Sequence, residues 1–236
     1  MDAVKASTTA DGNSPGAGLT PSTVPINDLP KDEFRALYGP WHGLAPAEVA
    51  TLLAGCPFRW WIAGGWAIEA GGGRARRHED TDLAVLRHDL ASVRAWLSRF
   101  HLWEAHDGTL RPLRPGDDIT PEREQLWMRR DAYGPWLLDI VLSPSVDDEW
   151  IYKRDERIRL PLDDVGFVDA EQISYMRPKI VLLFKAKHVR KKDEADFATA
   201  LDGLEDAGRE FLIRALRLTL PAHPWLATLE SRRSRC

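Results

Sequence analysis

Hydrophobic and polar positions follow two different patterns along this chain. Short apolar runs over residues 58–63, 102–104, 125–130 and 136–142 predict strands, and residues 150–160 alternate enough for a further strand or a hairpin. From Pro178 onward, apolar residues recur at helical spacing and predict helices over residues 178–191, 194–204 and 209–220. The chain therefore combines a mixed α/β N-terminal half with a helical C-terminal portion.

Turn residues and composition set the expected boundaries. Helices are predicted over residues 46–54, with Pro46 in the first turn, over residues 66–70, and over the amphipathic residues 89–100. Residues 111–124 form a loop rich in Pro and Asp. Residues 1–25 are rich in Ala, Ser, Thr, Gly and Pro without periodicity, which is typical of a disordered tail. We expect this tail, a first domain over residues 26–175 and a helical domain over residues 176–236.

Composition narrows the class of protein. The chain has 236 residues, 44% of them hydrophobic and 29% charged, which is ordinary for a globular protein with its own core. The net charge of −4 argues against a general nucleic-acid binder. Two cysteines, Cys56 and Cys236, provide neither a disulfide framework nor a metal motif. No segment has transmembrane length or a signal core, so we expect a cytoplasmic protein without a membrane partner; the oligomeric state is open.

The most informative segment joins a Gly-Gly turn to a pair of aspartates. An apolar strand runs into Gly64-Gly65 and a short helix, and a second strand is predicted to carry Asp80 and Asp82. Residues i and i+2 of a strand project from the same face, so the two carboxylates point together. Such a pair is unfavourable without a cation, for which Mg²⁺ is the simplest candidate. The glycine turn would let a triphosphate approach backbone N–H groups. This pattern indicates nucleotidyl transfer.

A third carboxylate is expected in a site of this kind. Asp139 lies between Leu138 and Ile140 on a strand predicted to be central, where an acid is costly to bury without a cation or hydrogen-bond partner. It could bind Mg²⁺ or accept the proton of an attacking hydroxyl. The alternative is an acid on an edge strand that faces water, which the apolar flanks disfavour.

Two cationic residues complete the candidate site. Arg77, in a basic stretch just before the aspartates, could neutralise a triphosphate or the leaving pyrophosphate, although a solvated loop would have the same composition. Lys187 shares a predicted helix face with Ile180, Leu183 and Phe184, so it could point at phosphates across a cleft between the two halves. A lone lysine on such a face more often extends to solvent.

Together, these motifs resemble the minimal nucleotidyltransferases of the DNA polymerase β superfamily, and especially the aminoglycoside and lincosamide nucleotidyltransferases. The resemblance implies an α+β fold, in which a mixed sheet with flanking helices is followed by a helical portion. It further implies that Asp80, Asp82 and Asp139 hold Mg²⁺ against ATP or another nucleoside triphosphate. Gly64, Gly65, Arg77 and Lys187 would bind the nucleotide. A hydroxyl of a small acceptor, such as an aminoglycoside- or lincosamide-like antibiotic, would then attack the α-phosphorus.

Two other functions share parts of this pattern. Nucleotidyltransferase toxins of toxin–antitoxin systems have a similar Gly-Gly and Asp-x-Asp core but modify tRNA or protein. The acidic balance leans against a nucleic-acid substrate, and tRNA stays open. A non-catalytic nucleotide-binding domain is the other alternative, which the intact Asp80, Asp82 and Asp139 disfavour. The sequence does not identify the acceptor, because fold and motif do not determine substrate.

Overall fold

The structure is a computed structural model that describes residues 29–106, 108–120 and 122–233. Its helices are α1 (Lys31–Tyr38), α2 (Pro46–Leu52), α3 (Gly64–Ala70), α4 (Leu90–Trp96), α5 (Pro178–Lys185), α6 (Lys191–Ala200), α7 (Asp206–Thr219) and α8 (Trp225–Arg233). Two 3₁₀ turns are η2 (Arg87–Asp89) and η3 (Leu162–Asp164). The predicted tail over residues 1–25 lies outside the described residues.

The strands form one large and one small sheet. The strands are β1 (Trp60–Ile62), β2 (Asp82–Leu86), β3 (His101–His106), β4 (Thr109–Pro112), β5 (Gln125–Arg129), β6 (Trp136–Ser143), β7 (Ser145–Val146), β8 (Glu149–Ile151), β9 (Arg159–Pro161), β10 (Gly166–Val168) and β11 (Ser174–Met176). The large sheet has the order β10-β11-β1-β2-β6-β5-β3-β4, and the small sheet has the order β7-β8-β9. Parallel pairs join β1 to β11 and β2 to β6, and the other pairs are antiparallel. The expected mixed sheet is confirmed.

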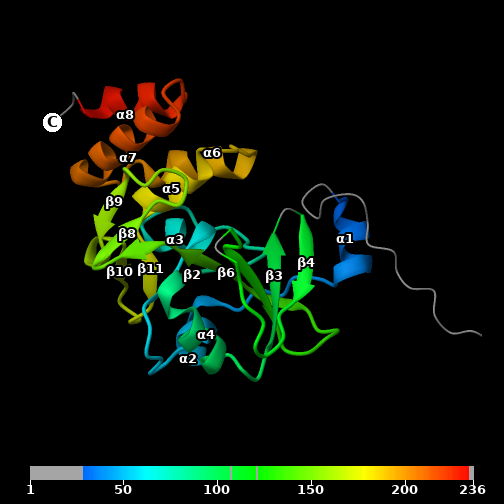
Figure 1. Cartoon of the computed structure of the whole chain (residues 1–236). Helices are drawn as coiled ribbons and strands as arrows, with labels where there is room; N and C mark the ends of the chain where they lie inside the picture. The colour runs from blue at the N-terminus through cyan, green and yellow to red at the C-terminus, as the bar shows by residue number, and fades with distance from the viewer. Residues whose placement is uncertain (1–28, 107, 121, 234–236) are drawn as a thin grey trace, which may run out of the picture.

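Helices lie at both ends of the molecule, with the large sheet between them. In Figure 1, α5, α6, α7 and α8 gather at one end, α2 and α4 lie at the opposite end, and α1 stands beside β3 and β4. The α+β class with flanking helices and a helical C-terminal portion is therefore confirmed. The division into domains at about residue 175 stays a prediction. Within the described residues, no helix is long and apolar enough to cross a membrane.

The apolar runs in the sequence predicted the central strands of the sheet but not the short strands. The runs at 58–63, 102–104, 125–130 and 136–142 correspond to β1, β3, β5 and β6, and residues 150–160 form the predicted hairpin as β8 and β9. Four strands were not predicted: β4, whose last two residues overlap the expected loop, and β7, β10 and β11. These strands have two to four residues each, too few for an alternating pattern to be recognised.

The first C-terminal helix is shorter than predicted. A single helix over residues 178–191 is wrong, because α5 ends at Lys185 and α6 begins only at Lys191. Residues 187–190 between them are exposed, including Val189, so no burial favours another helical turn there. The helices predicted over 194–204 and 209–220 correspond to α6 and α7 with shifted ends, while α1 and α8 were not predicted.

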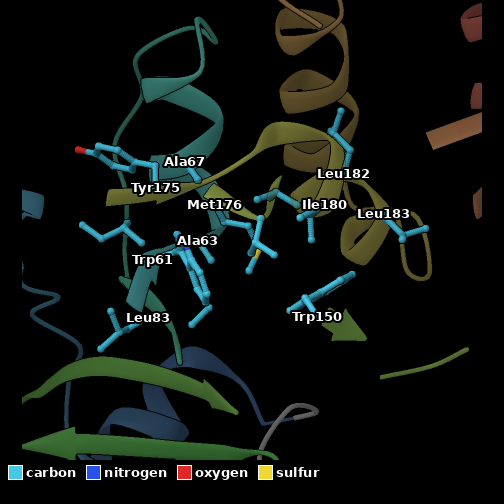
Figure 2. Close-up of a cluster of buried hydrophobic side chains, with 14 of the residues drawn as sticks. Trp61, Ala63, Ala67, Leu83, Trp150, Tyr175, Met176, Ile180, Leu182 and Leu183 are labelled. Carbon is cyan, nitrogen blue, oxygen red and sulfur yellow. The ribbon is translucent and has the colours of Figure 1, made fainter. Parts of the chain in front are cut away.

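The core joins the large sheet to α3, α5 and the small sheet. Figure 2 shows Trp61 of β1, Met176 of β11 and Ile180 of α5 in one apolar cluster. Trp150 of β8 lies in the same cluster, is fully buried, and meets the ring of Phe184 edge-on at 6.1 Å between centroids. This packing positions β1, β2 and α5, which supply the residues of the candidate site.

Removal of the Trp150 side chain should destabilise the whole fold. We expect Trp150→Ala to lower the free energy of unfolding by about 3–5 kcal/mol, because it leaves a large cavity between the small sheet and α5. Trp96→Ala, at a position where the side chain is 38% exposed, is the control and should cost much less. Urea titration followed by far-UV circular dichroism measures both values, and equal losses would contradict this account of the core.

Candidate active site

Two of the predicted carboxylates lie side by side on neighbouring strands. Strands β2 and β6 pair in parallel, and Asp82 is in register with Asp139. Asp139 is buried, with 8% of its surface exposed, and Asp82 is partly buried at the start of β2. Flanking Leu and Ile residues keep both strands in the core, so their pairing brings the two acids together. These two carboxylates therefore lie on strands of the packed sheet rather than on loops.

Asp80 reaches the same site from outside the strand. The prediction that Asp80 and Asp82 share one strand is wrong, because β2 begins at Asp82 and Asp80 belongs to the loop before it. All three predicted aspartates nevertheless line one cavity. Thr81, which lies between Asp80 and Asp82 in the sequence, is buried. Its hydroxyl donates to the Leu44 carbonyl oxygen at 2.7 Å and anchors the loop to the fold.

The Gly-Gly turn is required by the side chains packed against it. Gly64 has a φ of +61°, and a Cβ atom there would lie 1.8 Å from Asp82 Oδ2. A Cβ atom on Gly65 would lie 2.3 Å from Arg76 Nη2 and 2.6 Å from His78 Nδ1. Only glycine allows these polar groups to approach the start of α3 so closely. Sequence reasoning placed a phosphate at this turn, whereas the structure places Asp82, Arg76 and His78 against it.

The paired carboxylates are strongly perturbed. Burial, followed by the charge of Asp80, raises the pKa of Asp82 to about 6. Burial and the charge of Asp82 raise the pKa of Asp139 well above its usual range. Each group therefore holds its proton at a pH where an exposed aspartate would be ionised. A bound cation would reverse this effect.

The carboxylate oxygens are only partly satisfied by the protein. Gln125 Nε2 donates to Asp139 Oδ2 at 2.5 Å, while Asp139 Oδ1 is buried without a hydrogen-bond partner among the described residues. Hard carboxylate oxygens in this state suit Mg²⁺. Within the described ranges, however, no three His, Cys, Asp or Glu side chains are gathered closely enough to hold one metal ion. The donor chemistry fits Mg²⁺, and Asp80 would have to close on the other two acids.

Two cavities meet at these residues. The first has a volume of about 800 Å³ and is lined by the three aspartates and by aromatic and cationic side chains. The second has a volume of about 390 Å³ and is largely apolar, with Val141, Met176 and Phe184 in its wall. Four residues line both cavities: Asp82, Gln125, Lys185 and Arg190. The site can therefore hold two molecules that meet at Asp82.

Cations from two distant segments line the side of the first cavity near α6. They are Arg76, Arg77, Lys185, Arg190 and Lys192. Arg77 is thus where the sequence placed it. Lys187, in contrast, is exposed and does not line either cavity, because α5 ends two residues before it. Lys185 lies at the site instead.

Lys185 is held by a buried ionic network. Its Nζ atom lies 2.6 Å from Asp193 Oδ1 and 2.9 Å from Asp196 Oδ2, and all three side chains are at least nine-tenths buried. Arg76 donates two hydrogen bonds to Asp196, and Arg190 donates to Asp193. Burial by itself would raise the pKa of Asp193, but its bonds from Arg190 and Lys185 lower it to about 2. The network joins α5 and α6 to the loop after α3.

The sequence analysis did not place this network at the candidate site, and it chose Lys187 rather than Lys185. The available signal was the pair of aspartates at i and i+3 on one helix face, which predicts a common cationic partner. Gln125 was also missed, since a glutamine at the start of a strand carries no distinctive pattern.

Comparison with known families identifies the same segment. Residues 47–115 match the profile of the family described as aminoglycoside-2''-adenylyltransferase. The chain resembles the aminoglycoside and lincosamide nucleotidyltransferases. The matched residues include the Gly-Gly turn, Asp80 and Asp82, and end before Asp139. No curated protein matches the chain by sequence.

Solved structures of similar proteins include two antibiotic-modifying proteins. The solution structure of the antibiotic-resistance factor ANT(2'')-Ia has a TM-score of 0.49 and 18% identity, and the match covers 79% of this chain and 94% of that one. ANT(2'')-Ia in complex with adenylyl-2''-tobramycin has a TM-score of 0.48 and 17% identity, covering 80% and 98%. The lincosamide antibiotic adenylyltransferase LnuA, bound to lincomycin, has a TM-score of 0.45 and 16% identity, covering 65% and 92%.

The perturbed carboxylates predict that stabilisation by Mg²⁺ depends on pH. A raised pKa in the folded state contributes stability below the unfolded pKa, and this contribution is lost as the pH rises through about 6. Mg²⁺ binds the deprotonated carboxylates, so it should raise the melting temperature more near pH 8 than near pH 5. Calorimetric melting of wild type and Asp139→Asn, with and without MgCl₂, measures this difference. An equal Mg²⁺ effect at both pH values in the wild type would contradict it.

The close approach at Gly64 gives a second prediction. Gly64→Ala should weaken Mg²⁺-dependent nucleotide binding by about tenfold or more, which corresponds to about 1.4 kcal/mol, because its methyl group would displace the Asp82 carboxylate. Gly72→Ala is the matched control, since Gly72 also has a positive φ of +94° but nothing lies within 4 Å of the added Cβ atom. It should cost only the backbone strain of about 1–2 kcal/mol in stability. Isothermal titration calorimetry with an ATP analogue distinguishes displacement from strain, and equal binding by the two variants would rule out displacement.

Proposed function

We propose that this protein is a nucleotidyltransferase that transfers an adenylyl group from ATP to a hydroxyl group of a small-molecule acceptor, with Mg²⁺ as the metal ion. The observation that carries the proposal is the position of Asp82 at the junction of two cavities, paired in register with Asp139. A transferase needs two substrates to meet at one reacting atom, and this arrangement provides both spaces. The family match over residues 47–115 supports the same reaction class.

The second cavity suits the nucleotide. Its apolar wall, which includes Val181 and Phe184, would accept a flat base, and Ser143 supplies a hydroxyl for polar contact. Lys185 and Arg190, which line both cavities, lie where the triphosphate would pass the junction. Gly64 and Gly65 line the second and first cavities, so their backbone lies along the same path.

The metal site would be formed by the three aspartates. Asp80, Asp82 and Asp139 would hold Mg²⁺, which when bound supplies positive charge against the phosphate oxygens. The unpartnered Oδ1 atom of Asp139 supports its assignment as a ligand. Because the site holds several negative groups at close range, the buried carboxylates are arranged for a cation and not for mutual hydrogen bonding.

The reaction follows from the positions of the chain's own groups. An acceptor in the first cavity would present its hydroxyl oxygen to the α-phosphorus at the junction. Asp139, which would be deprotonated beside the bound cation, would accept the hydroxyl proton as the new O–P bond forms. The bond to the β-phosphate oxygen breaks, and pyrophosphate leaves toward Arg76, Arg77 and Lys192. These cations stabilise the charge that develops on the leaving group.

Nucleotide binding tests this proposal directly. We expect a non-hydrolysable α,β-methylene analogue of ATP to bind the wild-type protein only with Mg²⁺, and Asp82→Asn to weaken this binding by about tenfold or more. Asp118→Asn, in the exposed loop before β5, is the control and should bind as the wild type does. Isothermal titration calorimetry measures all three affinities. Mg²⁺-independent binding, or wild-type affinity in Asp82→Asn, would overturn the proposed site.

A further inference from the structure

The carboxylates of the first cavity are all committed to other partners. Four acids line it, and three of them are the aspartates assigned to the metal. The fourth, Glu79, accepts a hydrogen bond and ion pair from Lys31 Nζ at 2.7 Å. Each lining carboxylate in the described part of the chain is therefore already assigned to a cation, either Lys31 or the proposed metal ion.

The carboxylates of the second cavity are also assigned to cations. Its acidic lining residues are Asp82 and Asp193. Asp193 is paired with Lys185 and Arg190, at 2.6 Å and 2.7 Å. An acceptor with several positive charges would consequently lose its hydration in either cavity without gaining a counterion, which is strongly unfavourable.

Three aromatic side chains that pack on one another line the first cavity and form an aromatic wall. It consists of Phe34 of α1, Trp41 and Trp127 of β5. Trp127 is contacted edge-on by Trp41, at 5.0 Å between ring centroids, and by Phe34, at 5.9 Å. Phe34 and Trp41 are only partly buried, so part of their ring surface is available to a ligand. Such a surface packs well against a flat apolar ring.

Among the described residues, one cation next to this wall has no counterion. Arg35 of α1 is exposed, lines the first cavity, and forms no ion pair there. Aromatic faces also attract cations, but Arg35 already places an unpaired positive charge beside them, whereas the charge of Lys31 is balanced by Glu79. The acidic Asp32 and Glu33 of the same helix do not line the cavity. The local charge therefore favours a neutral or negative ligand.

We infer that the acceptor is a hydroxyl-bearing compound with a flat ring, neutral or negatively charged, which packs on Phe34, Trp41 and Trp127 beside Arg35. This inference rests on the proposed function and narrows its acceptor. It separates this chain from enzymes that modify polycationic acceptors, such as the one that carries adenylyl-2''-tobramycin in the similar structure. Helix α1 is the specificity-determining element, because it supplies both Phe34 and Arg35.

Probe binding to the full chain tests the inference. We would titrate anilinonaphthalene sulfonate, an anionic ring compound, and its neutral counterpart N-phenyl-naphthylamine, following their fluorescence, and use tobramycin as the polycationic competitor. The variants are Phe34→Ala, Arg35→Glu and, as a control, Arg214→Glu at an exposed position of α7 outside both cavities. Each variant's melting temperature is measured first, so that loss of folding is not mistaken for loss of binding.

The expected pattern differs between the two probes. Phe34→Ala should weaken both by about fivefold or more, and Arg35→Glu should weaken only the anionic probe by about tenfold, while Arg214→Glu should change neither. Tobramycin should not displace either probe from the wild type. Displacement of the probes by tobramycin, or probe affinities unchanged by both α1 variants, would overturn the inference.

The outcome is independent of the test of the proposed function. Nucleotide-analogue binding reports on Asp82 and the second cavity, whereas the ring probes report on α1 and the first cavity. If the analogue fails to bind but the probes behave as expected, the transferase proposal fails and the ring-binding site stands. If the analogue binds but tobramycin displaces the probes, only the acceptor class is wrong.

Discussion

The rest of the site depends on one unfavourable contact, the pairing of two carboxylates on adjacent parallel strands. Asp82 and Asp139 are in register, and their burial raises the pKa of both. Two buried acids on paired strand positions are tolerated only when a proton or a cation lies between them. Because the surrounding sheet is tightly packed, the acids cannot move apart to relieve the repulsion. Positive charge placed next to Asp82 and Asp139 is therefore stabilising.

Two features of the surrounding elements place other groups close to these carboxylates. Gly64 lets the start of α3 pass directly against the Asp82 carboxylate, which no other residue would allow. Lys185, Arg190 and Arg76 bring three positive charges close to the acids, and Asp193 and Asp196 balance two of them. This network fixes the cations in place without neutralising the paired carboxylates. The arrangement is consistent with the proposed binding of a metal ion and a polyphosphate.

The two cavities differ in their lining residues, and this difference favours a different kind of molecule in each. The second cavity combines an apolar wall with cations at its junction, as a nucleotide requires. The first cavity combines the metal-facing acids with aromatic rings and Arg35. The family resemblance says little about the acceptor, since the proposed acceptor contacts come from α1 and β5, and both elements lie outside residues 47–115. The acceptor class therefore has to be argued from this chain's own side chains.

The sequence by itself indicated the proposed chemistry of this protein: the Gly-Gly turn, Asp80, Asp82 and Asp139 are recognisable because glycine and buried acids are costly wherever they are not needed. It also indicated the central strands and the helical C-terminal portion, because the spacing of apolar residues in a long segment matches either a strand or a helix. Only the tertiary structure decided the rest. Lys185 rather than Lys187 reaches the site because α5 stops where burial ends. Asp193, Asp196, Gln125 and the aromatic wall acquire their roles through contacts between segments far apart in the chain, and no local pattern encodes such contacts.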